Sequence, residues 1–332
     1  MNLAAYDIVE STQAGAARRG AMSLARDIGL DEVEVGRVGI VVTEATTNMV
    51  KHAEGGRLLV QPIANGEGSG VETLALDSGP GLARVAEVMR DGFSTSGTPG
   101  TGLGAIRRQS NQFEMWSAPG KGTALFSRVW TRDHARGTPP FAIGGVSVPM
   151  RGEELCGDAW ARREHEGRTI LLVVDGLGHG VPAHDAARAA IEVFGSTSEE
   201  SPHALMELLH GALRPTRGAA AAVVRLDPVL SRATFCGVGN IEASIVHAGG
   251  VHHLVSHFGT LGHQVRKIRA FEYAFPHDAT LVLHSDGVSR RWDFSDYPGL
   301  LERHPALVAG VLYRDHQRER DDATVVVVRR IA

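Results

Sequence analysis

The sequence predicts an α/β (α+β) chain made of two domains. Its length of 332 residues exceeds the common size of a single domain. The first part shows two helical patterns followed by two strand-like runs, at about 14–29, 34–53, 57–63 and 72–77. The second part has more strand-like runs, with helical patterns near 183–195 and 202–213. The two parts therefore differ in the balance of helix and strand.

The stretch "TRDHARGTPP" (131–140) is the predicted linker. It follows the strand-like "GTALFSRVW" (122–130), is polar and ends in two prolines, so neither a helix nor a central strand continues through it. The stretch "FAIGGVSVPMRG" then begins a new alternating pattern. We therefore place the two domains at 1–134 and 135–332.

The composition is that of an ordinary soluble globular protein, with 43% hydrophobic and 22% charged residues. A formal net charge of −4 gives no electrostatic case for binding nucleic acid or an anionic membrane, so we expect neither as a partner. No apolar run approaches the length of a membrane span, and the first residues do not resemble a signal peptide. Cys156 and Cys236 form neither a zinc motif nor a disulfide framework, which favours a cytoplasmic protein.

The stretch "VVTEATTNMVKHA" (41–53) places Glu44 and Asn48 four residues apart, on one face of a predicted helix. An amide oxygen near a carboxylate suits Mg²⁺, which takes few protein ligands and keeps waters and phosphate oxygens. The same helix carries an apolar stripe that can pack on a sheet, at Val38, Val41, Val42 and Ala45. Taken alone, this pattern is more typical of a solvated helix face than of a site.

Two further segments suggest a nucleotide pocket. The stretch "LALDSGPGL" (74–82) ends a predicted strand on Asp77, whose carboxylate could accept a hydrogen bond from an adenine amino group. The stretch "DGFSTSGTPGTGLGAIRR" (91–108) predicts a lid that runs into a helix near Leu103, where free backbone N–H groups can hold phosphate. Its "GTGLG" is not a dinucleotide fingerprint, because no strand immediately precedes it.

Together these three segments, within residues 1–132, resemble the GHKL-type ATP-binding fold of gyrase-type ATPases, heat-shock chaperones and histidine kinases. The resemblance implies an α/β sandwich that binds ATP with Mg²⁺. It implies that Asn48 holds the Mg²⁺ ion, that Asp77 binds adenine and that Thr123 lies near the adenine beside Asp77. It further implies that four glycines shape the pocket and lid, namely Gly79, Gly81, Gly102 and Gly104.

The histidines of the first domain argue against a self-phosphorylating sensor kinase. Only His52 and His134 occur before residue 135, and no separate helical hairpin offers a phosphoacceptor histidine. The stretch "EVMRDGFSTSGTPGTGLGAIRR" instead resembles the anti-sigma-factor type of serine/threonine kinase. In that family, the residue at the position of Glu44 is the candidate catalytic base that polarises the substrate hydroxyl.

The second domain places aspartates at the ends of predicted strands. The run from Ile170 to Val174 is typical of a strand buried on both faces, and it ends on Asp175 in "LLVVDGLGHG" (171–180). A buried carboxylate is costly unless it is paired, hydrogen-bonded or bound to a metal. Similar positions occur in "ELCGDAW", "TLVLHSDGVSRRW" and "RERDDATVVVVRR", at Asp158, Asp286, Asp321 and Asp322. Each Asp-Gly alone is more typical of a turn, but the set predicts a site for Mg²⁺ or Mn²⁺.

This set resembles the bacterial, SpoIIE-like branch of the PPM-type (type 2C) serine/threonine phosphatases, over about 140–330. The resemblance implies a β-sandwich flanked by helices and two bound Mn²⁺ or Mg²⁺ ions. It implies that the catalytic Asp175 bridges both ions, that the Gly176 carbonyl and Asp321 are ligands, and that Asp158 and Asp286 complete the site. The implied ligand set leaves out Asp322, the second aspartate of its pair.

Other polar residues near the predicted site receive lesser roles. Arg151 lies upstream of Asp158, but it is more typical of a surface charge, so no phosphate-binding arginine is assigned. His179 and His184 flank the glycine turn, and we expect them to support the structure, because aspartates already supply the metal ligands.

The combined hypothesis is a bifunctional signalling protein. The first domain would phosphorylate a serine or threonine of a STAS-domain regulator in a partner-switching pathway of stressosome or anti-sigma type, and the second would remove such phosphates. A downstream phosphatase or a sigma-factor regulator would be a further partner. One alternative is a phosphatase regulated by a non-catalytic ATP- or partner-binding domain. Another is a non-enzymatic switch that acts by binding.

Overall fold

The computed structural model describes residues 3–64, 68–85, 102–131 and 139–331. The predicted lid residues 91–101 and most of the predicted linker lie outside these ranges. The chain forms two compact units: Met1–Gly137 with Asp293–Arg314, and Thr138–Trp292 with Asp315–Ala332. The segment Asp293–Arg314 therefore groups with the first unit, although it belongs to the predicted second domain by sequence. The domain division after residue 134 stays a prediction.

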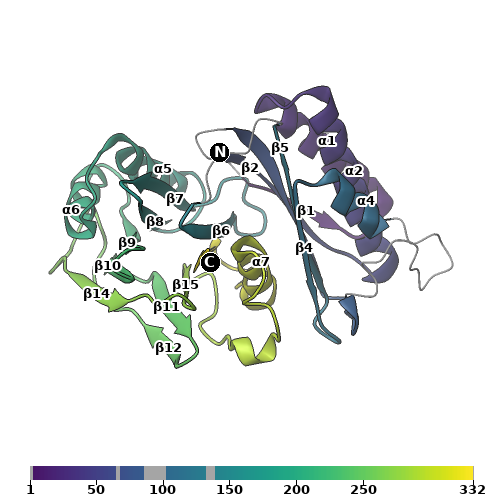
Figure 1. Cartoon of the computed structure of the whole chain (residues 1–332). Helices are drawn as coiled ribbons and strands as arrows, with labels where there is room; N and C mark the ends of the chain where they lie inside the picture. The colour runs from purple at the N-terminus through teal and green to yellow at the C-terminus, as the bar shows by residue number, and fades with distance from the viewer. Residues whose placement is uncertain (1–2, 65–67, 86–101, 132–138, 332) are drawn as a thin grey trace. The chain divides into compact units, whose positions relative to one another are not determined.

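The first unit contains an antiparallel sheet with strand order β1-β2-β3-β5-β4. Its strands are β1 (Ala4–Ile8), β2 (Gly56–Ala64), β3 (Ser69–Asp77), β4 (Gln112–Ser117) and β5 (Thr123–Trp130). The helices α1 (Ser11–Asp27), α2 (Glu32–His52) and α4 (Gly102–Gln109) cover one face of this sheet (Figure 1). This arrangement is the α/β sandwich that the sequence predicts.

The position of α2 follows from its cap and its apolar stripe. Asp31 caps the helix, because its side chain accepts hydrogen bonds from the backbone N–H groups of Val33 and Glu34. The predicted stripe is buried in the core beneath the helices, at Val38, Val41, Val42 and Ala45. Alternate strand residues such as Leu58 and Val60 enter the same core, as the period of a strand requires.

The segment Asp293–Arg314 packs on strands of this unit. It contains the short 3₁₀ helix η1 (Phe294–Asp296) and most of α7 (Pro305–His316). The indole N–H of Trp116 donates to the Pro298 carbonyl at 3.1 Å, and the His304 ring stacks on Phe126 with centroids 4.3 Å apart. A Cβ atom at Gly310 would lie 3.2 Å from a methyl of Leu76, so α7 approaches β3 closely.

The second unit is a sandwich of two sheets. One sheet has the order β13-β10-β9-β8-β7 with β14 paired to β10, and the other has the order β12-β11-β15-β16-β6. The strands of the first are β7 (Asp158–His165), β8 (Arg168–Gly176), β9 (Ala219–Asp227), β10 (Arg232–Val238), β13 (Ser256–His257) and β14 (Ala270–Ala274). Those of the second are β6 (Phe141–Val148), β11 (Glu242–His247), β12 (Gly250–His253), β15 (Thr280–His284) and β16 (Ala323–Arg330).

The strand β8 lies between β9 and β7 and is buried on both faces. Leu171 and Val173 enter the core between the sheets. The alternate residues Ile170, Leu172 and Val174 enter a second core beneath α5 (Val181–Ser196) and α6 (Pro202–Ala212) (Figure 1). The predicted burial of this run on both faces is confirmed, and so is the β-sandwich with flanking helices. Among the described residues, no helix is both long and apolar enough to span a membrane.

Candidate functional site

The first predicted site is assembled from α2 and α4. Glu44 and Asn48 are both partly buried on α2, and Gly102 begins α4 beside them. A Cβ atom at Gly102 would lie 2.9 Å from Glu44 Oε2 and 3.6 Å from Asn48 Oδ1. Gly104, one residue further along α4 from Leu103, is buried. The structure thus brings together the residues that the sequence assigns to catalysis, Mg²⁺ and the lid base.

Asp77 stands at the end of β3, beside Thr123 at the start of β5. Its Oδ1 accepts hydrogen bonds from the backbone N–H groups of Gly79 at 2.9 Å and Thr123 at 3.1 Å. Within the described part of the chain, Oδ2 accepts no hydrogen bond, so it remains available to a ligand donor such as an amino group. Burial raises the pKa of Asp77, while these two hydrogen bonds and the nearby Arg314 act in the opposite direction.

Two glycines hold the loops around Asp77 in conformations that other residues rarely adopt. Gly81 and Gly122 have φ angles of 69° and 70°. A side chain at Gly81 would collide with the Ala118 carbonyl, and one at Gly122 would collide with the Asp77 carbonyl. Gly79 also has little space, because its Cβ would lie 2.7 Å from Ala53 Cβ. Gly122 was not among the residues expected from the sequence.

Arg314 is a further residue that sequence reasoning did not assign. It belongs to the first unit, and its guanidinium donates to the carbonyls of Asp77 at 2.7 Å and Lys121 at 2.8 Å. It therefore supports both loops that carry the predicted adenine contacts. No local signal could identify it, because it follows Asp77 by more than two hundred positions.

The second predicted site lies at the ends of strands in the second unit. Asp175 is the last residue but one of β8 and pairs in register with Asp158 of β7. Asp286 follows β15, and Asp321 precedes β16. Asp175, Asp286 and Asp321 line one cavity of about 760 Å³. Asp158, the strand partner of Asp175, is buried and accepts a hydrogen bond from Ser285 Oγ at 2.6 Å. The four predicted aspartates are therefore gathered around one place.

These carboxylates raise one another's proton affinity. Burial, together with the charges of Asp286 and Asp321, raises the pKa of Asp175 to about 7. Burial and the charge of Asp175 raise the pKa of Asp158 well above its usual range. Burial and the charge of Asp286 raise the pKa of Asp321. Negative charge in this cavity is thus poorly compensated by the protein itself, which is the condition that a bound cation relieves.

Asn240 supplies an independent sign of a missing partner. Its Nδ2 donates to Asp286 Oδ2 at 2.7 Å, while its Oδ1 is buried and has no hydrogen bond within the described ranges. A buried amide oxygen without a partner is costly. The hard oxygen donors of the three cavity aspartates and this unused oxygen fit Mg²⁺ or Mn²⁺. Asn240 was missed because it is a neutral side chain in "VGNIE" and does not share the aspartate-and-turn pattern of the other positions.

The loops that carry the site are fixed by backbone contacts. A side chain at Gly176 would collide with the Ala183 carbonyl, and one at Gly287 would collide with the Asp322 carbonyl. Asp322 accepts backbone hydrogen bonds on both oxygens, from Met150 at 2.7 Å and from Gly157 at 2.8 Å. Asp322 is therefore better explained as an anchor for these loops than as a ligand.

The remaining polar neighbours have local partners. His179 contacts Glu153 at 2.8 Å, and His184 contacts the Cys156 carbonyl at 3.0 Å, which fits the supporting role expected for both histidines. Burial, together with the charges of Asp158 and Asp322, raises the pKa of the Cys156 thiol, so this thiol is a poor nucleophile.

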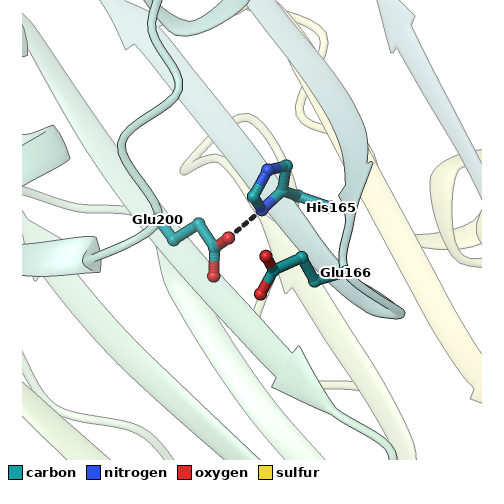
Figure 2. A group of neighbouring side chains, drawn as sticks. All are labelled: His165, Glu166 and Glu200. Carbon is teal, nitrogen blue, oxygen red and sulfur yellow. Dashed lines mark hydrogen bonds and ion pairs between the residues drawn. The ribbon is translucent and has the colours of Figure 1, made fainter.

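A separate group of His165, Glu166 and Glu200 also has converging ligand atoms, all within 4.8 Å of one another (Figure 2). The His165 ring points at Glu200 and is hydrogen-bonded to it. However, the Arg168 guanidinium lies 3.2 Å from Glu200 and 3.5 Å from Glu166. This cation already compensates both carboxylates, so we assign no metal to the group.

Fold and sites together define a histidine kinase-like ATPase domain followed by a PPM-type phosphatase domain. Residues 9–127 match the family described as the histidine kinase-like ATPase domain. Residues 165–331 match the family described as Stage II sporulation protein E (SpoIIE). The chain belongs to the SpoIIE family, and its first part belongs to the histidine kinase-like ATPase domain family.

Two curated relatives, both from Bacillus subtilis (strain 168), match different parts of the chain. The serine/threonine-protein kinase RsbT is 32% identical over 127 residues, covering 38% of this chain and 91% of RsbT. The phosphoserine phosphatase RsbX is 24% identical over 140 residues, covering 42% of this chain and 70% of RsbX. The predicted fusion of these two domain types is confirmed.

Solved structures share the fold of part of the chain. A structure from work on the bacterial stressosome, as a modular system adapted to control secondary messenger signalling, has a TM-score of 0.52 at 29% identity. It covers 57% of this chain and 99% of its own. A crystal structure of RsbX with magnesium has a TM-score of 0.52 at 19% identity, covering 59% and 98% of the two chains.

Proposed function

We propose that this protein is a metal-dependent phosphoserine and phosphothreonine phosphatase joined to a serine/threonine kinase that uses ATP with Mg²⁺. The observation that carries the phosphatase assignment is the gathering of Asp175, Asp286, Asp321 and the unused Asn240 oxygen at one cavity. The kinase assignment is supported by the approach of Gly102 to Glu44 and Asn48, and by the likeness to RsbT.

In the phosphatase, Asp175, Asp286 and Asp321 would hold two Mn²⁺ or Mg²⁺ ions, with the Gly176 carbonyl and Asp158 completing the site. Two such ions supply an activated water and neutralise charge on the transferring phosphoryl group. Asp175 would bridge the ions, while the bond from Asn240 keeps Asp286 oriented toward the cavity.

In the kinase, Asn48 would hold Mg²⁺ and Glu44 would polarise the substrate hydroxyl. The free Oδ2 of Asp77 would accept a hydrogen bond from the adenine amino group. Glu44 and Asn48 lie four residues apart on one helix face, so one rigid element would position both groups. Such positioning and charge neutralisation provide most of the catalysis in phosphoryl transfer.

The proposed substrates are STAS-domain regulators of a cytoplasmic partner-switching pathway. This proposal is supported by likeness to the kinase RsbT and the phosphatase RsbX, and by likeness to a protein from work on the stressosome. Fusion would hold opposing activities at high mutual effective concentration near one target. A downstream phosphatase or a sigma-factor regulator would be the further partner.

The test combines purified protein, a STAS-domain partner, ATP with Mg²⁺ and phosphoprotein mass spectrometry. We expect phosphorylated partner to accumulate with Asp175→Asn, because hydrolysis is lost while phosphorylation continues. We expect no phosphorylated partner when Glu44→Ala is added to Asp175→Asn. If Asp175→Asn accumulates none, although wild type strips phosphate from a separately phosphorylated partner, the kinase proposal fails for that partner.

One observation favours a second candidate, in which the first domain regulates the phosphatase by binding ATP. Arg314 lies in sequence between the proposed metal ligands Asp286 and Asp321, and it donates to the carbonyls of Asp77 and Lys121. ATP bound at Asp77 would then act on the chain segment that joins two metal ligands. Phosphatase activity that changes with ATP, without any phosphoprotein product, would support this candidate over the kinase.

A further inference from the structure

The cavity that holds the proposed metal ligands also contains basic side chains that metal binding does not explain. Arg290 and Arg320 line it together with Asp175, Asp286 and Asp321. Arg151, the only arginine considered from the sequence, is exposed and does not line this cavity. A phosphomonoester substrate is negatively charged, and both metal ions and nearby hydrogen-bond donors can stabilise that charge. The two arginines are therefore candidates to contact the substrate.

The two arginines differ in their partners. The Arg290 guanidinium lies 2.6 Å from Glu242, which also lines the cavity, so its charge is already matched. Arg320 is exposed and has neither an ion pair nor a hydrogen bond with any residue of the described ranges. Of the two arginines that line the cavity, Arg320 is therefore the one without an ion-pair partner among the described residues.

The backbone around Arg320 is held in place. The N–H of Arg318 donates to the Gly287 carbonyl at 2.7 Å, and the N–H of Asp322 donates to Asp321 Oδ1 at 2.9 Å. Gly287 directly follows the proposed ligand Asp286, so the first bond connects the turn that carries Arg320 to the loop of Asp286. The second bond involves the proposed ligand Asp321 itself. The side chain of Arg320 is exposed to solvent, but its backbone is fixed at the edge of the cavity.

We propose that Arg320 binds the phosphoryl group of the substrate. This inference rests on the proposed phosphatase function. A guanidinium offers five N–H donors in a planar fork that matches two phosphate oxygens, and it stays charged at every working pH. Arg320 would thus hold the phosphoryl group against the metal site, and would retain inorganic phosphate after hydrolysis.

The test compares Arg320→Gln with Arg318→Gln, a matched control that removes the same charge two residues away. Arg318 does not line the cavity, and its structural contact uses the backbone N–H, which the substitution keeps. With saturating Mn²⁺, one would measure KM for p-nitrophenyl phosphate and the inhibition constant of inorganic phosphate. We expect both to rise at least about tenfold in Arg320→Gln, as for loss of a charged hydrogen bond, and to change little in Arg318→Gln. Arg320→Lys should recover part of the phosphate affinity.

Two further measurements distinguish loss of phosphate binding from loss of metal binding. Calorimetric titration with Mn²⁺ should give the same metal affinity for wild type and Arg320→Gln, because Arg320 is not a ligand. Unchanged phosphate inhibition, or an equal rise in both glutamine variants, would overturn the assignment while leaving the phosphatase proposal intact. If wild type hydrolyses no phosphoester, the proposed function fails instead, and titration of Mn²⁺-loaded protein with inorganic phosphate still tests Arg320.

Discussion

At the scale of single residues, the central feature is a set of carboxylates placed where the protein alone cannot neutralise them. Asp175 and Asp158 face each other across a strand pair, and Asp286 and Asp321 add charge at the same cavity. Such an arrangement destabilises the metal-free fold, and a bound cation would reverse that penalty. Stability and metal binding should therefore be linked through pH.

In the metal-free protein, folding raises the pKa of Asp175 to about 7. The folded state then binds a proton more tightly than the unfolded state. This contribution to stability is present below the usual aspartate pKa and is lost as pH rises through about 7. We expect EDTA-treated protein to melt at a lower temperature at pH 8 than at pH 5.5, and added Mn²⁺ to raise the melting temperature mainly at pH 8.

The matched variant is Asp175→Asn, which removes the charge and keeps the shape. At pH 8 without metal, it should melt above wild type, by about 2–4 °C for each kcal/mol recovered. It should also lose most of the stabilisation by Mn²⁺. Thermal melts of both proteins at the two pH values provide the measurement. A metal-free variant that is less stable than wild type at pH 8 would contradict this electrostatic account.

At the scale of elements, the connection between β13 and β14 forms part of the cavity wall. It carries Phe258, whose side chain is 95% exposed, beside the half-exposed Val255. An aromatic ring left in water at the edge of a proposed active site is suited to contact a protein substrate. A small phosphoester has no protein surface to contact it.

We therefore expect Phe258→Ser to raise KM for a phosphorylated STAS-domain protein several-fold and to leave KM for p-nitrophenyl phosphate unchanged. The control is Val229→Ser, because Val229 is 89% exposed and does not line the cavity. Steady-state kinetics with both substrates test this expectation. An equal change for both substrates would mean that Phe258 affects the metal site rather than substrate docking.

The strand ends also show which residues of the candidate site a local sequence pattern can predict. Strand ends predicted the places of Asp175, Asp286 and Asp321, because a buried strand followed by a turn is a local signal. The positions of Asn240 and Arg314 depend on which distant loops meet, and no periodicity encodes that. Arg320 directly precedes Asp321, but it is one of several charged residues there and no pattern distinguishes it. The sequence therefore predicted which carboxylates meet at the cavity, but not the polar side chains that lie beside them.

At the scale of the whole molecule, the segment Asp293–Arg314 makes the two predicted domains interdependent. In sequence it lies within 135–332, yet its side chains pack on strands of the first unit. His304 stacks on Phe126, and its backbone N–H donates to Glu114 Oε2 at 2.6 Å. Cutting the chain at the predicted linker would remove these contacts.

We therefore expect the fragment 135–332 to be less stable than the full chain, because the apolar side chains of this segment would become exposed to water. The fragment should aggregate or melt at a lower temperature, and co-expression with 1–134 should recover a soluble complex. In the full chain, His304→Ala should lower the melting temperature, whereas His203→Ala, which alters a half-exposed histidine of α6, should not. Thermal melts and size-exclusion chromatography measure these outcomes. A fragment 135–332 that is monomeric and melts like the full chain would show that the segment folds without the first unit.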